Sequence, residues 1–302
     1  MKTNFLILFF SFLFVCTSIH AEDCIELTNK ILRGSVLKNS PDDKAVFHIN
    51  SNTADETFQN AKINFLKIIE KTNEDGNRLV DILEDLKKKD NIKELKHSKK
   101  DKEELLEELK GIRKQAIILR SVFEIYSTTH MSPEQFEKFT KKLGKLNDFL
   151  DFDAWKAIPD GAKSTAKAFD LETIKKELNG FTASTPEATQ LHLERLKKEI
   201  YQLVNKENLT VDEFHETRKH LKHFLAITQI ENKKEGSNLD ETFKFLEEMN
   251  EELGSLRDDV LEVEVKAINK GKKLDDEDYQ HIPENLKSEI RVFLKGFKIQ
   301  ID

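Results

Sequence analysis

Apolar residues recur at helical spacing over most of the chain. Leu, Phe and Ile side chains repeat at intervals of three and four residues, which places them on one face of a helix. The pattern predicts seven main helices, over 53–87, 102–127, 132–149, 185–204, 210–231, 238–270 and 283–297, and a shorter one over 170–178. The expected fold class is therefore all-α.

Polar residues mark where several of these helices begin. Thr53 with Glu56, and Thr210 with Glu213, have the spacing of a capping box. In that motif the Thr hydroxyl accepts from the third helical amide while the Glu side chain reaches back. Ser132, followed by a proline, predicts another helix start.

Two segments predict interruptions between helices. The tripeptide at 159–161, Pro-Asp-Gly, is typical of a turn. The dense charge run at 87–102 predicts a solvated helix end and loop. Within the helix at 185–204, the residues expected to face inward are Leu191, Leu196, Ile200 and Leu203.

The first 21 residues have the pattern of a secretory signal peptide. Lys2 is the only charge before Glu22, and an apolar run from Phe5 to Val15 leads to polar residues and Ala21. Because a membrane span needs about 20 apolar residues, this run is too short to cross a bilayer. We expect cleavage near Ala21 and a secreted or periplasmic protein, and no later segment is apolar enough to be a transmembrane helix.

Composition supports a charged helical protein and narrows its chemistry. Charged residues make up 35% of the chain, and Gly (10) and Pro (5) are too scarce for a sheet protein rich in turns. The net charge of −7 disfavours strong binding of polyanions over the whole surface, and no specific nucleic-acid binding is expected. Cys24 is the single cysteine of the mature chain, so no intramolecular disulfide can form.

One helix pair occurs twice in the sequence. The first copy is LKGIRKQAIILRSVFEIY (109–126) followed by FEKFTKKLGKLNDFLD (136–151). The second copy is FHETRKHLKHFLAITQ (214–229) followed by FKFLEEMNEELGSLRDDVLE (243–262). Each has Arg-Lys in mid-helix, then a polar turn, then a helix containing Leu-Gly-x-Leu-(Asn/Arg)-Asp. The offset of 105 to 110 residues indicates a multi-helix unit rather than a short solenoid repeat.

This two-copy pattern resembles the conserved histidine α-helical domain (CHAD) family. The second copy matches the family's motifs at His215, Arg218, Lys219, Lys222, Leu253, Gly254, Arg257 and Asp258. The first copy departs from them, with Lys110 in place of His, Ile117 in place of a basic residue and Asn147 in place of Arg. The resemblance implies two similar helical bundles about a pseudo-twofold axis. We place these at 53–180 and 181–302, after a polar segment at 22–52.

The resemblance also implies binding of inorganic polyphosphate on the basic helices. Side chains three and four residues apart share one helix face, so the basic positions of each copy form a stripe. Arginine offers forked donors and lysine a point charge, and two facing stripes would make a cationic groove. The candidate ligand-binding residues are Lys110, Arg113, Lys114, Arg120, His215, Arg218, Lys219 and Lys222.

A structural interpretation of the same residues stays open. Each arginine can form an ion pair within its own bundle, Arg113 with Asp148 and Arg218 with Asp258. The expected structural set is then Asp148, Asp258, Gly144 and Gly254, with the glycines as positions of close approach between helices. The two interpretations are compatible if the arginines are structural and the neighbouring His and Lys residues line a site.

Other motifs do not predict catalysis or a cofactor. The segment 262–266 matches the E-x-E-x-K signature of triphosphate tunnel enzymes, but it continues a helix and leaves too few residues for a barrel. His220 and His223 could seat a metal ion, yet no third ligand stands at a fitting spacing beyond Glu216. We therefore expect neither an enzyme nor a metal site.

The sequence thus predicts a non-catalytic protein that binds polyphosphate or another phosphate-rich anion through basic helix stripes. The alternative is a structural or protein-interaction module of the cell envelope, with a protein partner and no small ligand.

Overall fold

The computed structural model describes residues 37–40, 46–69, 78–234, 237–269 and 279–302. Within these ranges the chain forms eleven helices and four short strands, so the predicted all-α class is confirmed. No helix in the described ranges is long and apolar enough to cross a membrane. The predicted signal peptide and Cys24 lie outside the described residues.

The chain divides into two compact units. Unit 1 contains Glu194–Ile299 together with the described residues up to Phe47, and unit 2 contains His48–Leu193 and the last three residues. The boundary therefore differs from the predicted one at 180/181, and falls inside a single helix, α10 (Pro186–Val204).

Backbone hydrogen bonds explain the later boundary. Thr128 N donates to Thr182 O at 2.9 Å, and Ser184 N donates to Tyr126 O at 2.7 Å. Ser127 and Ala183 form an antiparallel bridge between these bonds. Residues 182–184 are thus held against the end of a unit 2 helix, and sequence spacing alone does not reveal such a pairing.

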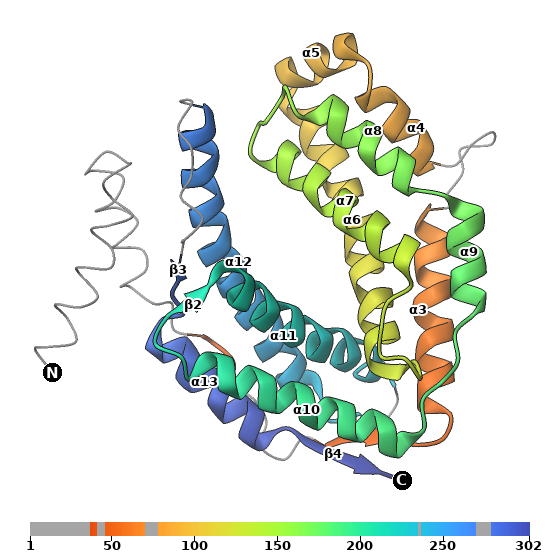
Figure 1. Ribbon diagram of the computed structural model, residues 1–302, viewed down its shortest axis with the longest axis vertical. Coiled ribbons are helices and arrows are strands. Elements are labelled where there is room, and N and C mark those ends of the chain that lie inside the picture. The colour runs from red at the N-terminus through yellow and green to blue at the C-terminus, as the bar shows by residue number, and fades with distance from the viewer. Residues whose placement is uncertain (1–36, 41–45, 70–77, 235–236, 270–278) are drawn as a thin grey trace, which may run out of the picture. The chain divides into compact units, whose positions relative to one another are not determined.

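Unit 2 is built from seven helices and the first turns of α10 (Figure 1). They are α3 (Thr53–Ile69), α4 (Arg78–Leu86), α5 (Lys89–His97), α6 (Lys99–Tyr126), α7 (Glu134–Asp151), α8 (Ile158–Ala168) and α9 (Leu171–Asn179). Strand β1 (Val46–Ile49) pairs with β4 (Lys298–Ile301), and the unit boundary passes through both.

Phenylalanine rings fill the core of unit 2. Phe58 on α3 stacks on Phe181 with ring centroids 3.8 Å apart, and Phe123 on α6 meets both rings edge-on. Phe65 contacts Phe136 on α7 in the same way at 5.2 Å. Burying one such side chain contributes about 1.5–3 kcal/mol, so these rings supply much of the energy that holds α3, α6 and α7 together.

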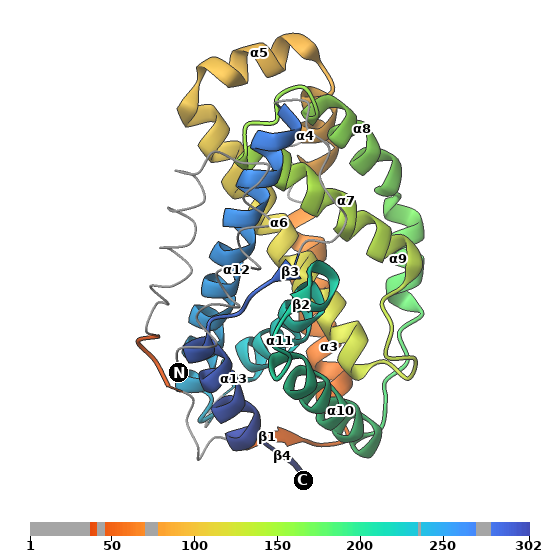
Figure 2. The same ribbon diagram turned by 60° about the vertical axis from the view of Figure 1, so that its left-hand side comes forward.

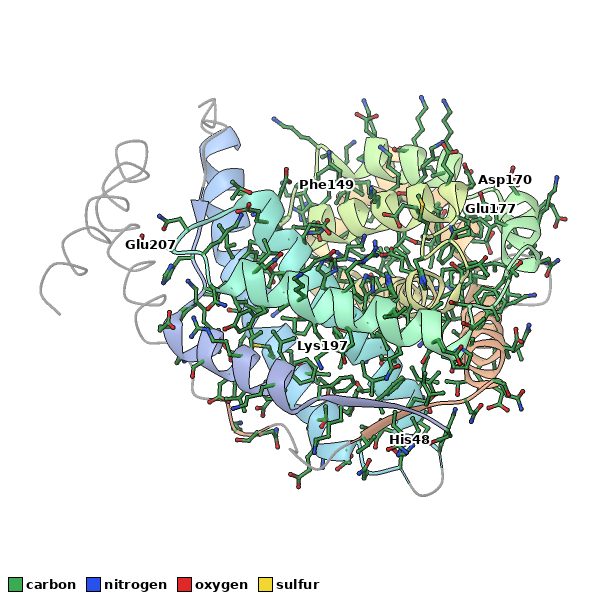
Figure 3. All side chains as sticks on the ribbon, turned by 60° about the horizontal axis from the view of Figure 1, so that its bottom comes forward. His48, Phe149, Asp170, Glu177, Lys197 and Glu207 are labelled. Carbon is green, nitrogen blue, oxygen red and sulfur yellow. The ribbon has the colours of Figure 1, made fainter. Side chains whose placement is uncertain are left out.

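A carboxylate from another helix caps the start of α7. Glu177 on α9 accepts from the backbone N–H groups of Gln135 and Phe136, each at 2.9 Å (Figure 3). The predicted Ser132 cap is therefore wrong. The residue before the helix is Pro133, which makes no side-chain capping bond. The acceptor comes from a residue more than forty positions away in the sequence.

The predicted turn at 159–161 is part of helix α8. Pro159 occupies the first turn, where its missing N–H would have no helical partner. Gly161 is required by packing, because a Cβ there would lie 2.9 Å from Cδ2 of Phe149 and 3.3 Å from Cδ1 of Leu146. Figure 2 shows α8 beside α7. The sequence at 159–161 is typical of a turn, but Gly161 instead allows close contact between α8 and α7.

The charge run at 87–102 contains helix α5 and the start of α6, not the predicted loop. Its lysines pair with acids along the helix, for example Lys93 with Asp90 at 3.2 Å and Lys99 with Glu103 at 3.5 Å. Ser98 ends one helix and caps the next by accepting from the Asp101 amide. These i,i+3 and i,i+4 pairs support a helix that has few apolar residues.

Unit 1 contains the rest of α10 and the helices α11 (Val211–Glu231), α12 (Asp240–Asn269) and α13 (Glu284–Gly296). Strands β2 (Leu209–Thr210) and β3 (Tyr279–Gln280) form a two-residue antiparallel pair. The core is again aromatic. Phe224 meets Phe293 and Phe297 edge-on at 5.7 and 5.3 Å, and Phe293 lies 5.8 Å from Phe245.

Helix α10 buries Leu196 and Ile200 as predicted, but it does not bury Leu191. Leu191 is 72% exposed, whereas Thr189 and Leu193 are buried. The buried row runs on through Leu196, Ile200 and Val204, at spacings of three and four residues from Leu193. Leu191 lies outside that row because the buried Thr189 takes the inward position that the apolar pattern assigned to a leucine.

Packing at Gly161 predicts opposite effects for two glycine-to-alanine substitutions. Gly161→Ala should lower the free energy of unfolding by about 1–2 kcal/mol, because the methyl group collides with the Phe149 ring. Gly111→Ala on α6 should raise it by about 0.5–1 kcal/mol, because its Cβ would meet only Ile68 at an ordinary 3.6 Å. Urea denaturation of both variants measures the difference, and equal effects would contradict the packing argument.

Candidate anion-binding helices

The first predicted stripe lies on α6 and is largely neutralised by carboxylates. Lys110 Nζ lies 3.1 Å from Asp151 Oδ1, and Arg113 Nη1 lies 3.1 Å from Asp148 Oδ1. Both acids belong to α7. Lys114 is exposed and has no carboxylate partner among the described residues.

Arg120 is the most enclosed cation of this stripe. Its side chain is 12% exposed and lies 3.7 Å from Glu124 on the same helix and 3.7 Å from Glu137 on α7. Lys141 also approaches Glu137, at 3.3 Å. The guanidinium is therefore part of a mixed charge cluster that joins α6 to α7, and it does not present a face to a ligand.

A glycine lies under the Arg113 guanidinium. A methyl group at Gly144 would lie 3.3 Å from Nη2 of Arg113, which is tighter than most contacts of this kind. Gly144 and Asp148 are one helical turn apart on α7, so they share one face. The glycine lets the arginine cross the helix surface to reach the aspartate.

The second predicted stripe lies on α11, whose start is capped as the sequence predicts. Thr210 Oγ1 accepts from the Glu213 amide, and the Glu213 carboxylate accepts from the Thr210 amide, which completes the capping box. On the helix that follows, His215 is exposed, and Lys219 and Lys222 are half-buried.

Arg218 repeats the glycine contact of the first stripe. A methyl group at Gly254 on α12 would lie 3.3 Å from Nη2 of Arg218, the same distance as at the first site. Asp258 stands four residues after Gly254, as Asp148 does after Gly144. Each unit thus contains a basic helix whose arginine lies across a glycine of the following helix.

The histidines of α11 pack against neighbouring side chains. His223 is 1% exposed, and His220 Nε2 lies 3.4 Å from Glu199 of α10 and 4.0 Å from Glu216. Among the residues that the structure describes, no group of three or more His, Cys, Asp or Glu side chains could hold a metal ion. The E-x-E-x-K segment at 262–266 lies on helix α12.

A buried lysine supports the segment before α11, and its charge acts on the nearby His281. Lys287 is 4% exposed and donates from Nζ to the backbone carbonyl of Lys206 at 2.7 Å. Burial lowers its pKa. Burial, and secondarily the positive charge of Lys287, also lowers the pKa of His281. Lys206 in turn holds the Glu213 carboxylate at 2.5 Å, which lowers the pKa of Glu213.

One set of basic residues was not singled out in the sequence. Four exposed lysines on α7 and α8 have no carboxylate partner among the described residues: Lys142, Lys145, Lys163 and Lys167. Their helical spacing was visible in the sequence. What the sequence did not show was that α8 is a helix and packs beside α7.

Comparisons with known proteins give no significant match. No protein-family model matches the chain, and neither the curated proteins nor the solved structures contain a sequence or fold that is significantly similar.

The Arg113–Asp148 contact predicts a small but measurable coupling. Both side chains are partly exposed, at 32% and 43%, so solvent screens the pair. A double-mutant cycle with Arg113→Met and Asp148→Asn should give a coupling energy of about 0.5 kcal/mol in urea denaturation. A cycle on the more exposed Lys110–Asp151 pair is the control and should give a smaller value. A coupling no larger than that of the control would contradict a structural role for Arg113.

The lowered pKa of His281 predicts a loss of stability in mild acid. Its folded-state pKa is lowered from the ordinary 6.5, so the unfolded chain binds more protons near that pH. The contribution of His281 to the free energy of unfolding should therefore be complete above about pH 6.5, and it should be lost as pH decreases below that value. Thermal denaturation between pH 5 and pH 8 tests this, with His281→Gln as the variant whose stability should change less. Identical pH profiles for both proteins would refute the assignment.

Proposed function

We propose that this chain is a divergent CHAD-like protein that binds a phosphate-rich anion without catalysing a reaction. The observation that carries the proposal is the repeated contact between arginine and glycine. Arg113 on Gly144 and Arg218 on Gly254 have the same 3.3 Å approach in the two units. This correspondence supports a duplicated helix pair with the motif positions that the sequence resemblance implies.

The proposal assigns binding to the second copy. In the first copy, Lys110, Arg113 and Arg120 already lie against carboxylates of unit 2. A ligand phosphate there would have to displace these acids or lie beside them, and both cost free energy. The second copy keeps the histidine and both lysines of the motif, at His215, Lys219 and Lys222.

Helix α11 suits a chain of phosphates. The three residues lie three and four positions apart, so they follow one side of the helix over about two turns. Lys219 and Lys222 are half-buried, which reduces screening by solvent relative to fully exposed lysines. Arg218, placed across Gly254, contributes to the positive potential while it holds α11 against α12.

The second candidate is a structural or protein-interaction module. It is favoured by the ion pairs of the first copy, because they join α6 to α7 and leave few charges for a ligand. In either case we propose a secreted or periplasmic protein, on the basis of the leader that the sequence predicts.

Binding of inorganic polyphosphate tests the lead function. The mature protein should bind polyphosphate at low salt, with an affinity that falls as salt rises. Lys219→Glu with Lys222→Glu should weaken binding at least tenfold, about 1.4 kcal/mol. If each contact releases about 0.7 counterion, the double variant should also flatten the salt dependence by about 1.4 in log–log slope.

The matched control reverses two charges in the first copy, at Lys110 and Lys114. Its affinity should stay within about threefold of the parent, because the proposal assigns binding to the second copy and Lys110 is already paired with Asp151. No binding by the parent protein, or equal losses in both variants, would leave the structural module as the better account.

A further inference from the structure

A lysine-rich surface lies on α7 and α8 of unit 2, on different helices from either predicted stripe. It comprises Lys142 and Lys145 on α7 and Lys163 and Lys167 on α8, and we call it the α7–α8 lysine face. Each pair is three or four residues apart, so its two members share a helix face. All four side chains are exposed.

Packing places the two pairs on neighbouring helices. Near one end, Gly161 of α8 fits against Phe149 and Leu146 of α7. Near the other end, Gln135 Nε2 donates to the backbone carbonyl of Ala168 at 2.7 Å. The helices are thus antiparallel and held at both ends, and Figures 1 and 2 show them side by side.

The lysines of this face differ from those of the lysine-rich segment at 87–102 in their carboxylate partners. Along 87–102 most lysines have a carboxylate partner within 4 Å, such as Asp90 for Lys93 and Glu104 for Lys100. None of the four lysines on the α7–α8 face has one within the described part of the chain, although Lys145 lies 5.6 Å from the Phe149 ring. Asp160 is the one acid of α8, and the nearest acids of α7, Asp148 and Asp151, pair with Arg113 and Lys110 of α6, so the four lysines are not balanced by these carboxylates.

We propose that the α7–α8 lysine face binds the surface of a membrane that contains anionic lipids. The face carries no arginine on either helix, so it lacks the forked donors that recognise individual phosphates. Compact ammonium groups on flexible stems instead suit a layer of headgroups whose charge is spread over an area. This site does not depend on the function proposed for α11.

Co-sedimentation with phosphatidylcholine vesicles, with and without phosphatidylglycerol, tests the proposal on the mature protein. Binding should require phosphatidylglycerol and weaken as salt rises. Each lysine near an anionic surface is worth about fivefold in partitioning, so Lys142→Glu with Lys145→Glu should reduce binding by about 25-fold or more. Lys163→Glu with Lys167→Glu is a second variant on the other helix and should have a similar effect.

The matched control is Lys93→Glu with Lys100→Glu, which changes net charge equally at exposed lysines that have acidic partners. It should lose no more than about threefold, because the charge of each control lysine is already balanced by a neighbouring carboxylate. Equal losses in control and test variants, or binding that ignores phosphatidylglycerol, would overturn the proposal. So would a lysine face that binds soluble polyphosphate but not vesicles.

The α11 variant separates this proposal from the proposed function. Lys219→Glu with Lys222→Glu should keep vesicle binding while it loses polyphosphate binding, and the α7–α8 variants should show the reverse. Circular dichroism of each variant checks that the helices are retained.

Discussion

The close approach of an arginine to a glycine on the next helix is a contact that the two units share. At Gly144 and Gly254 the hydrogen in place of a side chain leaves room for a guanidinium to lie across the helix, 3.3 Å from where a methyl group would be. In unit 2 this contact sets α7 against α6, and α7 then supports two further helices. Gly161 of α8 packs on its Phe149, and Glu177 of α9 caps its first turn.

The same contact determines whether an arginine is available to bind a ligand. An arginine that crosses a glycine to reach an aspartate contributes to helix packing, and its charge is already balanced within the protein. In unit 2 this applies to Arg113, and the two carboxylates around Arg120 give it a comparable environment. A protein with a net charge of −7 can still have positive regions, but they must lie where lysines lack acidic neighbours. For that reason the further proposal rests on the α7–α8 lysine face, whereas the proposal for α11 rests on the motif residues that this helix keeps, and the basic residues of α6 mainly join helices.

Most helices could be predicted because their signals are local. A row of apolar residues at three- and four-residue spacing, with a Thr–Glu capping box at its start, predicted α11 from Thr210 onward, and the structure confirms that start. Predictions failed where the outcome depends on contacts with another helix. The Pro-Asp-Gly at 159–161 has turn chemistry, yet it is helical because the glycine fits an aromatic ring of α7. The predicted Ser132 cap was wrong because the carboxylate of Glu177 on α9 accepts from backbone N–H groups in the first turn of α7.

The sequence by itself determined the helical class, the spacing of the basic residues and the paired Leu-Gly motifs, because each depends on residues within a few turns of one another. Only the tertiary structure decided which cations meet carboxylates, since the partners of Arg113 and Lys110 lie 35 and 41 residues away. It also decided the unit boundary, where backbone pairing between 126–128 and 182–184 carries the chain past the predicted break. Charge pairing and backbone pairing depend on distances in space, and helical periodicity does not encode those distances.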